Sequence, residues 1–214
     1  MKNRVKIEKV EALSHNWVRL DRYTIRYTRQ DGTSEILQRE VHDHGHGASV
    51  LPYDRQRGTV LLVRQFRLPA YLTDGGAGFI IEACAGLLDG EDSAVCAKRE
   101  AEEELALPRE AVRVIGTSDI YHTGTGFLVT PVVGLVPPGL ALIPSPTEVE
   151  AWFEAPLAML LNPASWTANE VFWRGANRRY LELEWQGFRI WGVTAAIIAN
   201  LSRRITLEAL RDAA

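Results

Sequence analysis

The chain lacks the features that mark secreted, membrane-spanning and nucleic-acid-binding proteins. It has only two cysteines, Cys84 and Cys96, too few for a disulfide framework, so we expect buried reduced thiols in a cytoplasmic protein. Its longest late apolar run, residues 193–201, is far too short to span a bilayer. The net charge is −3 and there is no basic tract, which argues against nucleic acid as a partner. The 214 residues, 46% of them hydrophobic, indicate one globular domain with an appendage.

Acidic residues concentrate instead in one short segment. Residues 99–104 contain one arginine and four glutamates, and around them three alanines and a leucine recur at spacings of three and four. This spacing predicts a helix with an apolar stripe, which begins near residues 90–92 because acids are favoured at the positive end of the helix dipole. On such a helix, Glu100, Glu103 and Glu104 converge on one side.

Three like charges on one patch repel one another unless a cation lies among them. Carboxylate oxygens with open positions suit Mg²⁺ or Mn²⁺, which prefer oxygen ligands and keep several waters. A solvated acidic helix face is the alternative interpretation. The glycine-bearing loop at residues 85–90 favours a metal site, because a loop followed by a helix brings backbone carbonyls beside the carboxylates.

This segment resembles the signature of the Nudix hydrolases, G-x5-E-x7-R-E-U-x-E-E-x-G-U, where U is a bulky aliphatic residue. The arginine-glutamate pair, the glutamate pair and the final aliphatic position of the signature are matched by Arg99, Glu100, Glu103, Glu104 and Leu107. The residues expected to bind metal are therefore all present.

The supporting positions of the signature depart from the pattern. Ala101 and Ala106 stand where a bulky aliphatic residue and a glycine are usual. The first glutamate of the signature has two candidates. Glu91 has the right spacing to the arginine but makes the loop from Gly86 one residue short, whereas Asp92 restores the loop and shortens the other spacing.

The resemblance implies roles for individual residues. Divalent ions, Mg²⁺ or else Mn²⁺, would bridge the diphosphate oxygens and lower the pKa of an attacking water. Arg99 would orient a metal-binding glutamate, and Glu148 is our candidate for the general base, with a solvated loop carboxylate as the alternative. The expected metal ligands are the carbonyl of Ala85 and the carboxylates of Glu100, Glu103 and Glu104, of which Glu103 is also counted as catalytic.

The first 46 residues are expected to form a small antiparallel sheet. Strand-like runs cover residues 5–13, 17–28 and 34–42, and a turn at residues 30–32 joins the last two. A sheet of this size seldom stands alone. In the Nudix hydrolases that act on GDP-mannose or ADP-ribose, which residues 39–50 and 60–67 resemble, such a sheet mediates dimerisation and lines the substrate pocket. We therefore expect a homodimer, with the Nudix domain at residues 47–214.

The same resemblance selects two residues for substrate binding. Apolar runs at residues 49–53 and 59–66 predict a hairpin, after which Arg67 can grip a diphosphate with paired hydrogen bonds. Residues 72–78 are expected to be a glycine-rich loop. Glu82 ends the next strand, and in the ADP-ribose relatives the matching glutamate lies beside the substrate.

The second half of the chain resembles another branch. Residues 121–127 and 190–196 are similar to the coenzyme A diphosphatases, which release 3′,5′-ADP and phosphopantetheine. A late hairpin precedes a helix from Val193, with Ala196, Ile197 and Leu201 facing inward. Strands mixed with two principal helices around one sheet predict the α/β/α sandwich of the Nudix fold.

Three functions follow from these patterns. The leading one is Mg²⁺-dependent hydrolysis of a nucleoside diphosphate sugar, of the GDP-mannose or ADP-ribose type, to a nucleoside monophosphate and a sugar phosphate. The enzymatic alternative is coenzyme A diphosphatase. A different class is a catalytically silent Nudix module that binds a nucleotide and regulates a partner, which the intact glutamates disfavour.

Overall fold

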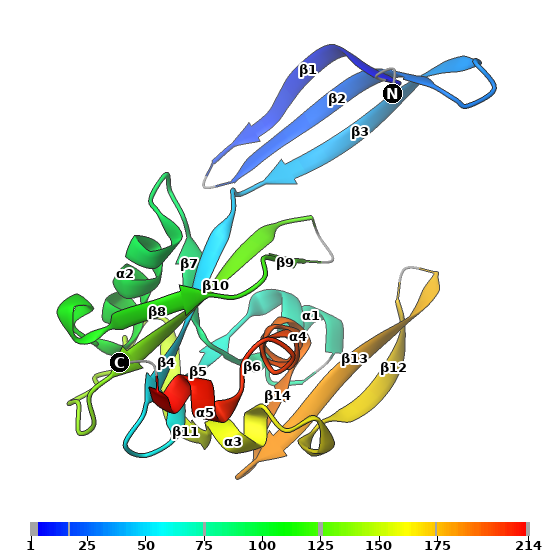
Figure 1. Ribbon diagram of the computed structural model, residues 1–214. Coiled ribbons are helices and arrows are strands. Elements are labelled where there is room, and N and C mark those ends of the chain that lie inside the picture. The colour runs from blue at the N-terminus through cyan, green and yellow to red at the C-terminus, as the bar shows by residue number, and fades with distance from the viewer. Residues whose placement is uncertain (1–3, 17, 75, 124–125, 174, 213–214) are drawn as a thin grey trace. The chain divides into compact units, whose positions relative to one another are not determined.

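The computed structural model describes residues 4–212, apart from positions 17, 75, 124–125 and 174. The chain divides into two compact units, Met1–Gly45 and His46–Ala214, which are described separately below (Figure 1). Within the described residues, every helix falls short of the length or apolar character needed to cross a membrane.

The first unit is a three-stranded antiparallel sheet in the order β1 (Val5–His15), β2 (Arg19–Thr28) and β3 (Ser34–Asp43). The three predicted strands are confirmed, although Trp17, the expected start of the second, lies outside the described residues. In the turn between β2 and β3, the Asp31 carboxylate accepts the backbone N–H of its second neighbour at 2.9 Å.

The second unit is built on a mixed sheet. Its strands follow the order β11-β5-β4-β10-β8, with β6 paired to β5, β7 to β4 and β9 to β10. β4 and β10 run parallel, and the remaining pairs are antiparallel. The strands are β4 (Gly47–Asp54), β5 (Thr59–Phe66), β6 (Phe79–Glu82), β7 (Cys84–Leu87), β8 (Arg113–Thr117), β9 (Tyr121–His122), β10 (Leu128–Val136) and β11 (Val149–Pro156).

Helices cover both faces of this sheet, because its strands alternate apolar residues between two cores. Along β5, Leu61 and Val63 join the cluster under α2, whereas Val60 and Leu62 join the cluster on the opposite face. The α/β/α sandwich predicted from the sequence is therefore confirmed. The helices are α1 (Leu68–Asp74), α2 (Ser93–Leu105), α3 (Leu157–Leu160), α4 (Gly192–Leu201) and α5 (Leu207–Asp212), with 3₁₀ turns at Arg109–Ala111 and Pro163–Ser165.

Two local expectations were wrong. The loop predicted at residues 72–78 overlaps the end of α1, whose Pro69 near the first turn suits a helix start; Gly75 lies outside the described residues. In α4, Leu201 is buried as predicted, but the other buried residues are Thr194, Ala195 and Ile198 and not Ala196 and Ile197, because the buried face includes a threonine that an apolar pattern does not count.

The second unit also contains a separate three-stranded sheet. It has the order β12 (Thr167–Trp173), β13 (Ala176–Trp185) and β14 (Phe188–Trp191). The hairpin of β13 and β14 is confirmed, whereas β12 was not expected. The β12 strand is exposed at nearly every described side chain, so it lacks the alternating pattern by which strands are recognised.

Candidate active site

The hydrogen bonds at the start of α2 show which of the two acids, Glu91 or Asp92, pairs with Arg99. The Asp92 carboxylate accepts the backbone N–H of Ala94 at 2.8 Å and so caps the helix. Glu91 is instead paired with Arg99, its Oε2 lying 2.9 Å from the arginine Nε. The structure therefore answers the question that the sequence left open, because Glu91 is the acid that engages the signature arginine.

The strand β7 lies close against α2, and this contact requires a glycine. A Cβ atom at Gly86 would collide with the carboxylate of Glu100. The Cys96 Sγ lies 3.2 Å from the carbonyl oxygen of Leu87, which adds a second tie between loop and helix. The first part of the loop predicted at residues 85–90 is therefore strand β7, and it holds the Ala85 carbonyl beside the acidic face of the helix.

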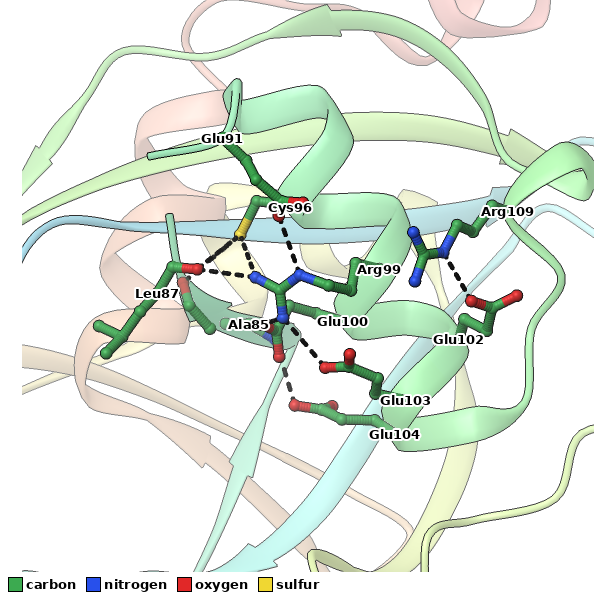
Figure 2. A network of polar contacts seen from close by, with 11 residues as sticks. Ala85, Leu87, Glu91, Cys96, Arg99, Glu100, Glu102, Glu103, Glu104 and Arg109 are labelled. Carbon is green, nitrogen blue, oxygen red and sulfur yellow. Dashed lines mark hydrogen bonds and ion pairs between the residues drawn. The ribbon is translucent and has the colours of Figure 1, made fainter. Parts of the chain in front are cut away.

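Arg99 is the centre of a charged network on this face (Figure 2). Its Nη1 lies 2.5 Å from Glu100 Oε1 and 3.0 Å from Glu103 Oε2, and its Nη2 donates to the Leu87 carbonyl at 2.8 Å. Its hydrogen bond to Glu91 and the bonds to the other two carboxylates raise its pKa. The guanidinium therefore remains charged and holds two of the predicted metal ligands in place.

Glu104 is the most deeply buried carboxylate of the site, with 2% of its surface exposed. Burial raises its pKa to about 7, although the side chains of Cys84 and Gln65 lie within hydrogen-bonding range and oppose that rise. Its Oε1 accepts a long bond from the Ala85 N–H at 3.4 Å, whereas its buried Oε2 has no well-formed hydrogen bond. A buried carboxylate oxygen without a partner needs a proton or a cation.

The other two glutamates of the predicted triad differ from Glu104 in exposure. Glu100 is 8% exposed, and its burial raises its pKa against the opposing effect of Arg99. Glu103 is half-exposed, and its carboxylate is paired with Arg99. Among the described residues, no three His, Cys, Asp or Glu side chains stand as a group that could hold a metal, since Arg99 takes the neutralising position beside Glu100 and Glu103.

The two residues predicted to bind substrate contact each other. Arg67 Nε lies 2.7 Å from Glu82 Oε2, and Arg67 Nη2 donates to Gln65 Oε1 at 2.6 Å. Glu82 on β6 lies opposite Val63 on β5, which puts its side chain on the same face of the sheet as Gln65. Sequence reasoning missed Gln65, whose only signal was an amide at the end of a buried apolar strand.

Glu148 lies on an exposed turn immediately before β11. This turn is tied to the end of α2, because the Ser145 N–H donates to the backbone carbonyl of Glu104 at 2.8 Å. The charge of Glu148 contributes to the raised pKa of Glu100, so the two carboxylates belong to one electrostatic environment. The turn that carries the candidate base is therefore joined to the end of α2.

Comparisons with known proteins agree with this architecture. Residues 4–42 match the model of the GDP-mannose pyrophosphatase NudK N-terminal domain, and residues 43–173 match that of the NUDIX domain. A GDP-mannose pyrophosphatase of Yersinia pestis (strain Pestoides F) is 49% identical over 102 residues, 47% of this chain and 52% of that protein. The match therefore spans about half the length of this relative.

Two further relatives extend the likeness over more of the chain. An uncharacterized Nudix hydrolase, NudL, of Escherichia coli O7:K1 is 36% identical over 174 residues, 80% of this chain and 88% of that protein. A solved structure of an ADP compounds hydrolase has a TM-score of 0.47 and 15% identity, covering 76% of this chain and 86% of that one. Because the NUDIX domain model matches more than half of its residues, this chain belongs to the Nudix hydrolase family.

Proposed function

We propose that this protein hydrolyses the diphosphate bond of a nucleoside diphosphate sugar, of the GDP-mannose or ADP-ribose type, to a nucleoside monophosphate and a sugar phosphate. The observation that carries the proposal is the buried Glu104. Its Oε2 has no well-formed hydrogen bond, and it shares helix α2 with the buried Glu100. The match of residues 4–42 to the NudK N-terminal domain supports a sugar nucleotide as substrate.

Carbonyl and carboxylate oxygens, the donors present at this site, are the ligand type that a hard divalent cation prefers. Nudix hydrolases generally depend on divalent metal ions. When bound, Mg²⁺ or Mn²⁺ would polarise the diphosphate and lower the pKa of a water molecule. The groups proposed to hold it are the Ala85 carbonyl and the carboxylates of Glu100, Glu103 and Glu104, of which Glu103 would turn from its pairing with Arg99 toward the other two.

The remaining residues of the site have separate tasks. Arg67 would exchange its bond to Glu82 for the substrate phosphate, and two guanidinium donors can engage two phosphate oxygens at once. Glu82 would then face the substrate. Glu148, exposed and close enough to influence Glu100, would take the proton of the attacking water, and Arg99 would keep Glu100 and Glu103 oriented.

The three-stranded sheet is proposed to mediate a homodimer in the cytoplasm and to line the substrate pocket. Its strand register places Val5, Ile7 and Val10 opposite Tyr27, Ile25 and Tyr23 on one face. The first three residues are 41%, 57% and 43% exposed, and such an apolar face favours burial against a partner. Residues 1–46 would then serve assembly and residues 47–214 would carry the chemistry.

Coenzyme A diphosphatase is the second candidate. Residues 121–127 and 190–196 resemble that branch, and the Nudix hydrolase NudL matches over 80% of this chain. Of these, positions 124–125 lie outside the described residues. A nucleotide-binding module without catalysis is the third candidate, and the intact glutamates argue against it.

A product assay distinguishes the three candidates. The full chain is incubated with Mg²⁺ and, in parallel, GDP-mannose, ADP-ribose and coenzyme A, and products are separated by chromatography. GMP or AMP released from the sugars supports the proposal, whereas 3′,5′-ADP from coenzyme A supports the second candidate. Binding of these compounds without metal-stimulated turnover, unchanged in Glu103→Gln, would support the silent module.

A further inference from the structure

Gln65 is a buried polar residue in a strand that is otherwise largely apolar. It is 2% exposed and shares the α2-facing side of β5 with Leu61 and Val63. Burying an amide is costly unless both its donor and its acceptor find partners. The neighbours of this amide therefore explain why it is there.

The two ends of the Gln65 amide meet groups of opposite character. Its Oε1 accepts from Arg67 Nη2 at 2.6 Å, and its side chain lies close enough to the Glu104 carboxylate to lower the pKa of that group. A guanidinium can only donate hydrogen bonds and an ionised carboxylate can only accept them. The oxygen must therefore face Arg67 and the NH₂ group must face Glu104.

Few side chains could replace this amide between those partners. A glutamate at position 65 could accept from Arg67 but would repel Glu104, and a lysine would repel Arg67. An apolar side chain of the same length would leave both partners without a bond. Glutamine alone among side chains of this length offers an acceptor and a donor on one rigid planar group.

The backbone also puts Gln65 between the other parts of the site. Across the sheet it lies opposite Val149 of β11, the residue after Glu148, and opposite Ile80 of β6, two residues before Glu82. The strand that carries the amide is therefore held on both sides by strands that carry the proposed base and the acid paired with Arg67.

We infer that Gln65 is a positioning residue whose amide links the proposed diphosphate clamp, Arg67, to the proposed metal ligand, Glu104. The inference rests on the proposed function. It assigns Gln65 no contact with substrate, because the amide acts through its two neighbours. Its consequence is that Arg67 supports cation binding at Glu104 even when no substrate is present, because Arg67 holds the amide that faces the carboxylate.

The test is Mn²⁺ binding to the full chain without substrate, followed by electron paramagnetic resonance of the free ion. Gln65→Met is expected to weaken Mn²⁺ binding about tenfold, as loss of a residue that orients a metal ligand does. Arg67→Met, one residue further from the carboxylate, is expected to weaken it about threefold. Gln65→Glu keeps the acceptor for Arg67 and replaces the donor that faces Glu104, so its Mn²⁺ affinity should also differ from that of the wild type.

Two matched controls separate this link from general effects of the substitutions. Arg64→Met removes an arginine of the same strand, which lies over the Phe79 ring at 4.2 Å, and Gln56→Met removes a glutamine from the turn after β4. Both should bind Mn²⁺ like the wild type. If Gln65→Met does not fold, Arg67→Met carries the test, because its side chain is 44% exposed and its loss leaves the core intact.

The outcomes distinguish the inference from the proposed function. Wild-type Mn²⁺ affinity in both Gln65→Met and Arg67→Met, with binding lost in Glu104→Gln, would overturn the link and leave the metal site standing. Absence of Mn²⁺ binding to the wild type would overturn the proposed function and the link together. Graded weakening in the two variants, with both controls unchanged, supports the link.

Discussion

Two of the buried oxygens without a well-formed hydrogen bond among the described residues lie on opposite faces of the central sheet, and they have different meanings. On the α2 face, Glu104 Oε2 lies among Gln65, Cys84 and Glu100, all of which are polar or titratable. On the opposite face, the hydroxyl of the fully buried Tyr53 lies in a cluster of apolar side chains. An orphaned group among other polar groups points to a ligand, whereas one in an apolar core is a cost to stability alone.

The largest expected effect is on catalysis at the α2 face. Glu104→Gln removes the charge proposed to hold a divalent ion, and kcat should fall on the order of 10³-fold because the transition state loses electrostatic stabilisation. Initial rates of nucleoside monophosphate release measure this. The matched control is Glu102→Gln on the same helix, whose carboxylate pairs with Arg109 at 2.6 Å and lies away from the site.

An equal loss of activity in the two variants would contradict this assignment. It would mean that any change of charge on α2 disturbs the enzyme. Activity within about twofold of the wild type in Glu102→Gln alone would instead keep the effect specific to the buried acid.

The same face should make the metal-free protein sensitive to pH. The pKa of Glu104 rises from its ordinary 4.5 to about 7 in the folded state, so between these values the folded chain holds a proton that the unfolded chain has released. Stability should therefore fall as the pH rises through this window, by about 3 kcal/mol at most, and level off above it.

Urea unfolding in the presence of a chelator measures this at pH 4.5, 6 and 8. Glu104→Gln cannot titrate, so it should lose that part of the pH dependence and be more stable than the wild type at pH 8. Added Mg²⁺ should restore the wild type at high pH through binding to the folded state. Parallel pH profiles for the two proteins would refute the buried, partly protonated acid.

The opposite face should respond in stability and not in activity. Tyr53→Phe removes the partnerless hydroxyl while keeping the ring in its apolar cluster, so the free energy of unfolding should rise by about 1 kcal/mol. Tyr180→Phe is the control, because that hydroxyl accepts a bond from Arg189 at 3.4 Å on an exposed strand. A loss of stability in Tyr53→Phe would show that its hydroxyl has a partner. A loss of activity would show that a change on this face of the sheet affects the active site on the other face.

Only part of the fold and of the candidate site could be predicted from the sequence. The apolar stripe of α2 and the strands of the hairpin follow from local periodicity, and the signature residues Arg99 and Glu104 follow from a motif of fixed spacing. The choice between Glu91 and Asp92 required the capping geometry. The bridge of Gln65 required knowing that β5 is buried on both sides and which strands flank it, which is long-range information that no local pattern contains.

The smallest expected effect lies at the C-terminal end of α2, where the signature usually has a glycine. Ala106 occupies this position in the left-handed conformation, with φ of 51° and ψ of 31°, and its N–H donates to the Glu102 carbonyl at 2.9 Å. Glycine adopts this conformation without the steric cost of a Cβ, but it also makes the unfolded chain more flexible. Ala106→Gly should therefore raise the free energy of unfolding by about 0.5–1 kcal/mol, whereas Ala94→Gly, in the right-handed part of the helix, should lower it by about 1 kcal/mol. Thermal unfolding of both variants measures the difference.

A gain in stability in Ala106→Gly with unchanged turnover would show that alanine at this position destabilises the helix end without disturbing the geometry of the site. A loss of stability would mean that the helix end relies on contacts of the Ala106 methyl group.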